Sequence, residues 1–185
     1  MTQVVLGLGS NRDFRGLNPV RLLRAAYDFL SETLNEIVCS SVYRTKALYV
    51  TDQADFYNMA VTGRVADAVV PSALLAEIHR IEAALGRNRA EEIRFGPRTI
   101  DIDIELFGCQ HVSEPDLEIP HPRLCERAFI LIPLLEISEN SADCIEREKY
   151  AAALKKIPEQ GVELYMSASR FLYSPEVADG TAHTG

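Results

Sequence analysis

Several features that would fix the class of this protein are missing from its sequence. No apolar run is long enough to span a bilayer, so a membrane protein is not expected. Residues 1–3 lead straight into an apolar stretch without a basic region or a cleavage site, so we see no secretory signal and expect a cytoplasmic protein. The cysteines form no CxxC pair, which argues against zinc and favours free thiols. They are Cys39, Cys109, Cys125 and Cys144.

An excess of positive charge is also absent. The chain has 19 basic and 27 acidic residues and a net charge of −8, so no general attraction to nucleic acid or to an anionic membrane surface is expected. A phosphate-binding P-loop is missing too, because the glycines at 7 and 9 are not followed by the Gly-Lys-Ser/Thr ending. A phosphoryl-transfer enzyme with this sequence must therefore be of an unusual type.

The order of predicted elements indicates the fold class. A chain of 185 residues with 47% hydrophobic content suits one globular domain, which we place at 1–173. Helices are predicted to begin at Asn18-Pro19 and at Pro71, because asparagine caps and proline opens helices. Apolar patterns predict four strands, over 4–9, 37–43, 56–65 and 98–107. This βαββαβ order predicts an α+β, ferredoxin-like fold: an antiparallel sheet with helices on one face.

The segment beyond about residue 138 is longer than this core needs. Apolar residues predict helices over 128–137 and 145–157, and a strand pair or edge strand over 161–173. Two roles stay open for this extension, which either covers a sheet edge or makes an oligomer contact in a protein otherwise expected to be a monomer. Residues 174–185 lack apolar periodicity and are expected to form a disordered tail.

One predicted strand carries three acids on the same face. After Arg98, polar and apolar residues alternate from Thr99 to Leu106, so Asp101, Asp103 and Glu105 are expected on one face and the isoleucines with Leu106 on the other. Like charges along one face repel each other. A bound Mg²⁺ would relieve that repulsion and would keep room for waters and substrate phosphates. The alternative is a solvated sheet face.

Arginines gather just before this acidic strand. Guanidinium groups bind phosphate through paired hydrogen bonds and stay charged at working pH. The alternative is ordinary surface pairing with Glu82, Glu91 or Glu92. For a cluster beside acids, phosphate together with Mg²⁺ explains more. The arginines are Arg80, Arg87, Arg89, Arg94 and Arg98.

Specific motifs in one collinear order resemble a known family. The most specific block is Arg94-Phe95-Gly96-Pro97-Arg98-Thr99-Ile100-Asp101-Ile102-Asp103. It is accompanied by Gly9-Ser10-Asn11, Tyr43-Arg44-Thr45, Phe56-Tyr57-Asn58, Pro120-His121-Pro122-Arg123 and Arg127-Ala128-Phe129. With these motifs, residues 3–138 resemble the 6-hydroxymethyl-7,8-dihydropterin pyrophosphokinase family.

The resemblance implies an enzyme of folate biosynthesis that moves the pyrophosphoryl group of ATP to the hydroxymethyl oxygen of the dihydropterin and releases AMP. Two Mg²⁺ ions would be held by Asp101 and Asp103. The catalytic residues implied are Arg87, Arg98, Asp101 and Asp103. The ATP-binding residues implied are His79, Glu82, Arg87, Arg89, Arg94, Arg98, Ile104 and His121. The pterin-binding residues implied are Thr45, Leu48, Phe56, Asn58, Asp101 and Phe129.

Plain structural roles compete with some of these assignments. Phe56 and Phe129 would, on pattern alone, be core residues, although a flat pterin ring also needs aromatic faces above and below it. His79 lies one helical turn from Glu82 and suits a solvated helix face equally well. Glu105 matches no ligand position of the family, so we expect it to be solvated or paired with an arginine.

Two functions from other classes stay open at this point. A ferredoxin-like nucleic-acid-binding module would use the arginines, but the net charge of −8 counts against it, and no nucleic-acid or membrane partner is expected. A metal-dependent phosphodiesterase would use the same acids and would differ from the pyrophosphokinase in its product.

Overall fold

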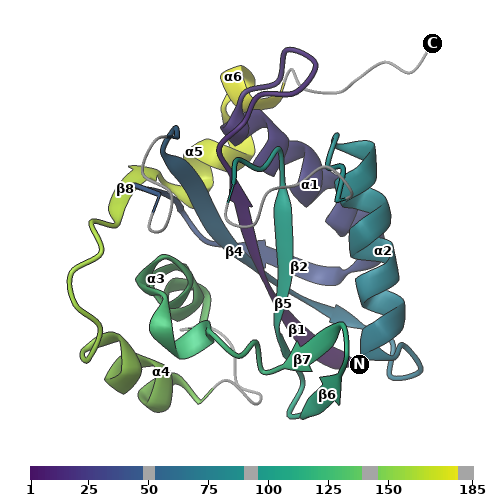
Figure 1. Cartoon of the computed structure of the whole chain (residues 1–185). Helices are drawn as coiled ribbons and strands as arrows, with labels where there is room; N and C mark the ends of the chain where they lie inside the picture. Colours follow the sequence, from purple (N-terminus) through teal and green to yellow (C-terminus); the bar gives the residue numbers. More distant parts are fainter. Residues whose placement is uncertain (48–52, 90–95, 139–145, 179–185) are drawn as a thin grey trace.

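The centre of the protein is an antiparallel sheet, seen in a computed structural model that describes residues 1–47, 53–89, 96–138 and 146–178 (Figure 1). Its path runs β5-β1-β4-β3-β8, with β2 also paired to β4. A separate hairpin joins β6 and β7. The strands are β1 Thr2–Ser10, β2 Asn35–Cys39, β3 Val42–Thr45, β4 Phe56–Val65, β5 Asp101–Phe107, β6 Val112–Glu114, β7 Leu117–Ile119 and β8 Glu163–Met166.

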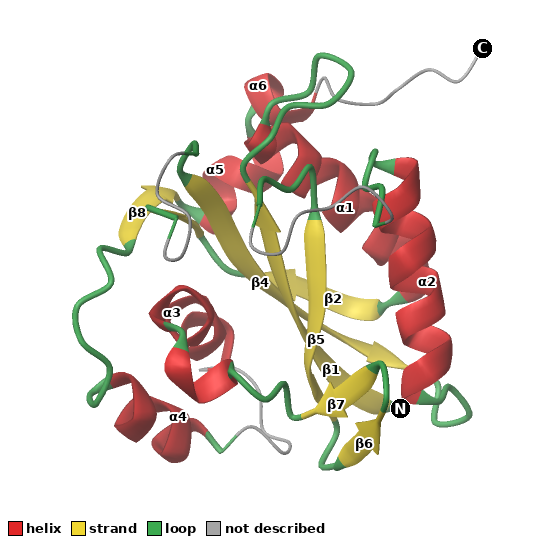
Figure 2. Ribbon diagram, viewed as in Figure 1, coloured by secondary structure: helices red, strands yellow, loops and turns green. Residues whose placement is uncertain are grey.

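Helices cover both faces of the sheet (Figure 2). The prediction of helices on one face only is therefore wrong. Consecutive residues of β1, Val4, Val5 and Leu6, are all buried, and because side chains alternate along a strand, both faces of β1 are apolar. Val4 and Leu6 pack with α1 and α2, whereas Val5 packs with α3 and α4.

The predicted helix starts are confirmed. α1 opens with Asn18 as its cap, whose side chain accepts a hydrogen bond of 3.0 Å from the Arg21 N–H, and α2 opens with Pro71. The helices are α1 Pro19–Thr33, α2 Pro71–Ala84, α3 Ala128–Ile137, α4 Arg147–Leu154, α5 Ala168–Tyr173 and α6 Pro175–Ala178, with a 3₁₀ turn, η1, at Leu124–Glu126.

The strand predicted over 37–43 is divided into β2 and β3. Ser40 and Ser41 lie at the break and are buried. The Ser40 hydroxyl accepts from the Ala60 N–H of β4, and the Ser41 N–H donates to the Glu136 carboxylate of α3. The Ser40 N–H still donates to the Ala60 carbonyl oxygen, and side-chain groups make the other polar bonds at the break, which a hydrophobic pattern does not reveal.

A β-bulge interrupts the alternation of β5. Leu6 pairs with Ile104 and Val5 pairs with Leu106, which leaves Glu105 without a partner on β1. The extra residue turns Leu106 to the face covered by α3, while Ile102 and Ile104 pack on the α1 and α2 face. The prediction that Leu106 shares a face with the isoleucines is therefore wrong.

The C-terminal extension covers the edge of the sheet. β8 pairs with β3, and Phe171 of α5 packs edge-on against Tyr27 of α1, with ring centroids 6.1 Å apart. Val177 of α6 is buried in the same cluster. The expectation of a disordered tail from residue 174 is thus wrong for residues 174–178, whereas 179–185 lie outside the described residues.

Two further expectations can be compared with the structure. In the part of the chain that the structure describes, no helix combines the length and the hydrophobicity needed to cross a membrane. Cys39 and Cys125 are free thiols, as expected. Cys109 takes part in a disulfide, so the expectation of free thiols is wrong at that position.

Candidate active site

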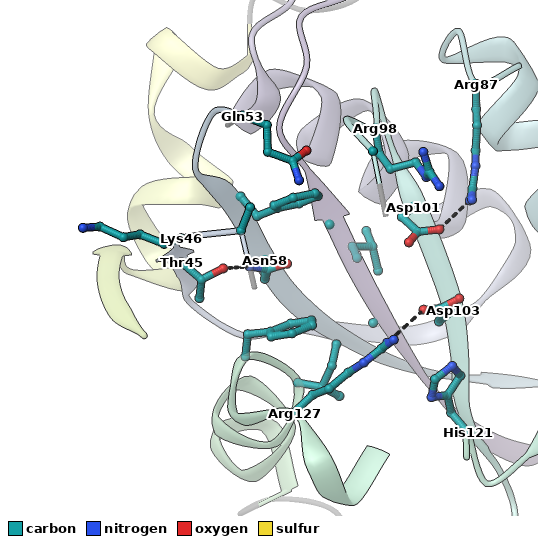
Figure 3. Close-up of a pocket in the computed structure, with 18 residues that line it drawn as sticks. Thr45, Lys46, Gln53, Asn58, Arg87, Arg98, Asp101, Asp103, His121 and Arg127 are labelled. Atoms are coloured by element: carbon teal, nitrogen blue, oxygen red, sulfur yellow. Dashed lines mark hydrogen bonds and ion pairs between the residues drawn. The ribbon is translucent and has the colours of Figure 1, made fainter. Parts of the chain in front are cut away.

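A cavity of about 340 Å³ opens where β1, β4 and β5 meet the start of α3 (Figure 3). Residues from segments far apart in the sequence line it. Those singled out from the sequence are Thr45, Phe56, Asn58, Arg87, Arg98, Asp101, Asp103, His121 and Phe129. The sheet thus brings the acidic strand, two arginines and the two phenylalanines to one place.

Asp101 and Asp103 face the cavity side by side on β5. Each lies near a guanidinium group: Arg87 Nη1 is 2.5 Å from Asp101 Oδ1, and Arg127 Nη1 is 3.9 Å from Asp103 Oδ2. Burial and the charge of Asp101 nevertheless raise the pKa of Asp103 to about 7. A cation bound between the two acids would offset both the burial of Asp103 and its repulsion by Asp101.

The carboxylate of Glu82 on α2 binds Arg87 and Arg89. Its side chain is only 1% exposed, and its carboxylate accepts from Arg87, from Arg89 Nη2 at 2.5 Å and from the backbone N–H of Ile102 at 2.9 Å. Pairing of the arginines with Glu82 is thus realised, but through a buried carboxylate that binds buried Arg87 and half-exposed Arg89 and leaves Arg87 on the cavity wall. Exposed Arg80 instead pairs with partly buried Glu77 and does not line the cavity.

His121 enters the cavity as a neutral imidazole. Burial, followed by the charge of Arg127, lowers its pKa to about 4. Its Nδ1 accepts a hydrogen bond of 3.2 Å from the Arg123 N–H, so the proton of the neutral ring is assigned to Nε2. A neutral histidine in this tautomer is a hydrogen-bond donor through Nε2.

Glu105 lies beneath the cavity and is fully buried, so the expectation that it is solvated or paired with an arginine is wrong. Neither carboxylate oxygen has a hydrogen-bond partner among the described residues. The nearest cation-forming group is His121, whose Nδ1 lies 3.9 Å from Glu105 Oε2. Burial, and next the charge of Asp103, raise the pKa of Glu105 well above its ordinary value. A Cβ on Gly7 would lie 2.8 Å from Glu105 Oε1, so the carboxyl packs directly against this glycine.

The other end of the cavity is lined by aromatic rings and an amide. Phe56 of β4 and Phe129 of α3 line it and are only partly buried, unlike core phenylalanines such as Phe107. Asn58 donates through Nδ2 to Thr45 Oγ1 at 2.9 Å. This end presents aromatic faces and an amide, which suits a flat polar ring.

Some predicted residues lie elsewhere. Ile104 is 4% exposed and packs in the core, and His79 is partly buried on α2, where burial and then the charge of Arg89 lower its pKa. Neither residue lines the cavity, nor do Glu82 and Arg89. Leu48 and Arg94 lie outside the described residues.

Other residues on the cavity wall were not predicted. Arg127 lines the cavity near Asp103, and its guanidinium carbon lies 5.7 Å from the centre of the Phe129 ring. Its place in the Arg127-Ala128-Phe129 motif was the available signal. Lys46 and Gln53 also line the cavity, and no pattern in the sequence marked them.

Among the described residues, the carboxylates of Asp101 and Asp103 are the candidates on the cavity wall for holding Mg²⁺. No cluster of three or more histidine, cysteine, aspartate or glutamate residues suited to a metal occurs in residues 1–47, 53–89, 96–138 and 146–178. A closed protein-only site is thus missing from these ranges. Two oxygen ligands on an open wall fit Mg²⁺, which usually keeps waters and binds substrate phosphates.

Comparison with known proteins identifies relatives over most of the chain. A family model described as 7,8-dihydro-6-hydroxymethylpterin-pyrophosphokinase (HPPK) matches residues 5–139. A 2-amino-4-hydroxy-6-hydroxymethyldihydropteridine pyrophosphokinase of Bacillus subtilis is 35% identical over 89% of this chain and 90% of its own length. One from Methylorubrum extorquens is 39% identical over 88% of this chain and 98% of its own length.

A solved structure has a similar fold. The wild-type HPPK-DHPS of Plasmodium falciparum with pteroate has a TM-score of 0.58 and 17% sequence identity over 86% of this chain. The match spans 47% of that longer chain. At this identity the likeness concerns the fold alone.

Proposed function

The chain belongs to the 7,8-dihydro-6-hydroxymethylpterin-pyrophosphokinase family, and from this membership we propose its reaction and the residues that perform it. The enzyme transfers the pyrophosphoryl group of ATP to the hydroxymethyl group of 6-hydroxymethyl-7,8-dihydropterin and serves folate biosynthesis. The observation that carries the proposal is one cavity with two chemically different ends, paired carboxylates and arginines at one and aromatic and amide groups at the other.

ATP occupies the charged end. Arg87 and Arg98 on the cavity wall bind phosphate oxygens, and His121 donates to one of them through Nε2. Arg127 adds a further guanidinium beside Asp103. The remaining ATP contacts proposed from the family are those of His79, Glu82, Arg89, Arg94 and Ile104.

The pterin occupies the aromatic end. Phe56 and Phe129 stack on the pterin ring, and the Asn58 amide hydrogen-bonds to the polar edge of the ring. A Cβ at Gly9 would lie 3.1 Å from Asn58 Oδ1, so glycine at that position keeps the approach to this amide oxygen open. Thr45 holds the amide through the bond to its Nδ2, and Asp101 reaches the ring from the charged end; Leu48 completes the proposed set.

Two Mg²⁺ ions are proposed, with Asp101 and Asp103 as their protein ligands. The residues present fit Mg²⁺, because carboxylate oxygens are hard ligands. The side chains of Asp101 and Asp103 are each about one-third exposed. Burial and the neighbouring acid raise the pKa of Asp103, and a bound cation would favour its charged form. When bound, the ions neutralise charge on the phosphates and lower the pKa of a coordinated hydroxyl.

The chain's own residues position the two substrates and stabilise the charge on the transferred group. The pterin hydroxymethyl oxygen attacks the β-phosphorus of ATP, and the bond from that phosphorus to the oxygen bridging the α-phosphate breaks, so that AMP leaves. Arg87 and Arg98 are placed to stabilise the charge that develops on the transferred group. Arg87 is held in place by Glu82 and Asp101, so little reorganisation is needed during the reaction.

The topology of the sheet and the bounds of the domain are also proposals. The ferredoxin-like topology is supported by the order β5-β1-β4 with β2 and β3 beside β4, all antiparallel. We extend the single domain from 1–173 to 1–178, because Val177 shares a hydrophobic cluster with residues of β1. The monomeric state, the cytoplasmic location and the absence of a nucleic-acid partner stay predictions from the sequence.

The experiment is an assay for AMP. The protein is incubated with ATP, Mg²⁺ and 6-hydroxymethyl-7,8-dihydropterin, and we expect AMP and the pterin diphosphate only when the pterin is present. Asp101→Ala and Asp103→Ala should lower the rate at least about a hundredfold while leaving the thermal transition in place. The matched control is Asp67→Ala, which removes an exposed aspartate that binds the N-terminus. Release of inorganic phosphate or cleavage of a diester, without AMP, would support the phosphodiesterase and refute the proposal.

A further inference from the structure

Asn11, the residue directly after β1, bonds to two separate segments through one side chain. Its Nδ2 donates to Gln53 Oε1 at 3.1 Å and to the Ala54 carbonyl oxygen at 3.0 Å. Its Oδ1 accepts from the Arg98 N–H at 2.8 Å. Because Ala54 offers a carbonyl and Arg98 an N–H, the orientation of the amide is fixed by backbone groups on both sides.

Backbone bonds reinforce one of the two connections. The N–H groups of Asn11 and Arg12 both donate to the Arg98 carbonyl oxygen at 3.0 Å. The peptide groups on either side of the Arg98 Cα are thus both tied to the end of β1, whereas the segment of Gln53 and Ala54 is tied to it through the Asn11 amide. The Asn11 side chain is therefore a polar link between the two segments.

The two segments serve opposite ends of the cavity. Gln53 lies on the side of Thr45 and Asn58, and Arg98 lies on the side of Arg87 and Asp101 (Figure 3). The first segment leads into Phe56 at the start of β4, and the second leads into the acidic strand β5. Asn11 itself is 5% exposed and is not among the residues that line the cavity.

We propose that Asn11 is a positioning residue that couples binding at the aromatic end of the cavity to binding at the charged end. This inference rests on the proposed function, in which the two ends take the pterin and ATP. A ligand that orders the Gln53 segment also orders Asn11 and hence the Arg98 backbone, and the effect is reciprocal because a coupling between two sites acts equally in both directions. The physical element that both ligands bias is the amide with its three partners.

The coupling is measured by binding alone. The Kd of 6-hydroxymethyl-7,8-dihydropterin is determined by calorimetry, with and without a non-hydrolysable ATP analogue and Mg²⁺. We expect the analogue to tighten pterin binding at least about fivefold in the unaltered protein, the lower end of typical couplings between sites. The ratio of the pterin Kd without the analogue to the pterin Kd with it measures the coupling. In Asn11→Ala this ratio should fall to within about twofold of one.

Two further variants test separately the hydrogen bonds that the Asn11 amide donates and the one that it accepts. Asn11→Asp keeps an acceptor for the Arg98 N–H but no longer donates to Gln53 and Ala54, so the ratio should fall although the Arg98 connection persists. Gln53→Ala removes one acceptor and leaves the Ala54 carbonyl, so its ratio should lie between those of the unaltered protein and Asn11→Ala. If Asn11→Ala does not fold, these two variants carry the test.

The matched control is Asn35→Ala. Asn35 is an exposed asparagine of β2 whose Nδ2 lies 3.5 Å from the Arg64 carbonyl oxygen, and its replacement should leave the ratio unchanged. A ratio near one in the unaltered protein, or an unchanged ratio in a folded Asn11 variant, would overturn the role of Asn11. Pterin-dependent AMP formation is assayed in parallel, so that a failure of the proposed function is seen separately from a failure of the coupling.

Discussion

Replacing Glu105 with methionine should stabilise the protein. The carboxyl group is fully buried, and neither oxygen has a hydrogen-bond partner in the described ranges. A buried polar group without a partner costs about 1–3 kcal/mol. Methionine is unbranched, like glutamate, and adapts to irregular spaces without a polar atom. We expect Glu105→Met to raise the free energy of unfolding by about 1–3 kcal/mol, with about 2–4 °C in Tm for each kcal/mol in a chain of this size.

The gain should depend on pH in a defined direction. Burial raises the pKa of Glu105 in the folded chain above its ordinary value of 4.5, so the folded state binds the proton more tightly than the unfolded state. The contribution of Glu105 to stability is therefore fully present below its ordinary pKa and is lost as pH rises toward the folded-state pKa. Thermal unfolding in the absence of Mg²⁺ and substrates should show a larger gain for Glu105→Met near about pH 8 than near about pH 4.

Glu136 provides a control of the same residue type with the opposite expectation. Its carboxylate accepts from the N–H and hydroxyl of Ser41 and from the Tyr43 hydroxyl. Glu136→Met leaves these donors without their acceptor and should lower stability by about 1.5–3 kcal/mol. A loss of several degrees in Tm for a well-folded Glu105→Met at the higher pH would show that the carboxyl is favourably bound, and would refute the reasoning.

Three more predictions follow from the site. Glu82→Gln should destabilise the protein by about 3–5 kcal/mol, measured by urea unfolding, because it breaks a buried network with Arg87 and Arg89. Mg²⁺ affinity, measured by calorimetry, should rise as pH increases through about 7, the raised pKa of Asp103, because the ligand must lose its proton; the rise should vanish in Asp103→Asn. Phe129→Leu should raise the KM for the pterin about tenfold and leave the KM for ATP within about twofold, since only the aromatic stack is removed; equal changes in both would contradict the assignment.

Local features of the sequence predicted most of the elements. The cap at Asn18, the proline at 71 and the apolar stripes located both main helices, because helix signals depend on residues within a turn or two of each other. The strand over 56–65 was predicted with its full bounds. The break between β2 and β3 was missed, because it depends on bonds from Ser40 and Ser41 to groups far away in the sequence.

The features of the site also divide into those that the sequence identified and those that only the fold creates. Motif residues such as Asp101, Asp103 and Phe129 were identified from the sequence, and they line one cavity. The hydrogen bond from the Ile102 N–H to Glu82 and the bonds of the Asn11 side chain were not predicted, because each depends on which distant segments the fold brings within hydrogen-bond distance.

By itself the sequence determined the family, the α+β class, the helix starts and the acidic strand with its arginines, because these depend on residue types and short spacings. The tertiary structure alone decided where that alternation ends and which of the three acids is buried. The bulge at Glu105 turned Leu106 to the face covered by α3, and packing on that face buried Glu105 while Asp101 and Asp103 stayed on the cavity wall. Pairing with β1 sets that register, and the covering of both sheet faces sets the burial, and both are contacts between segments distant in the chain.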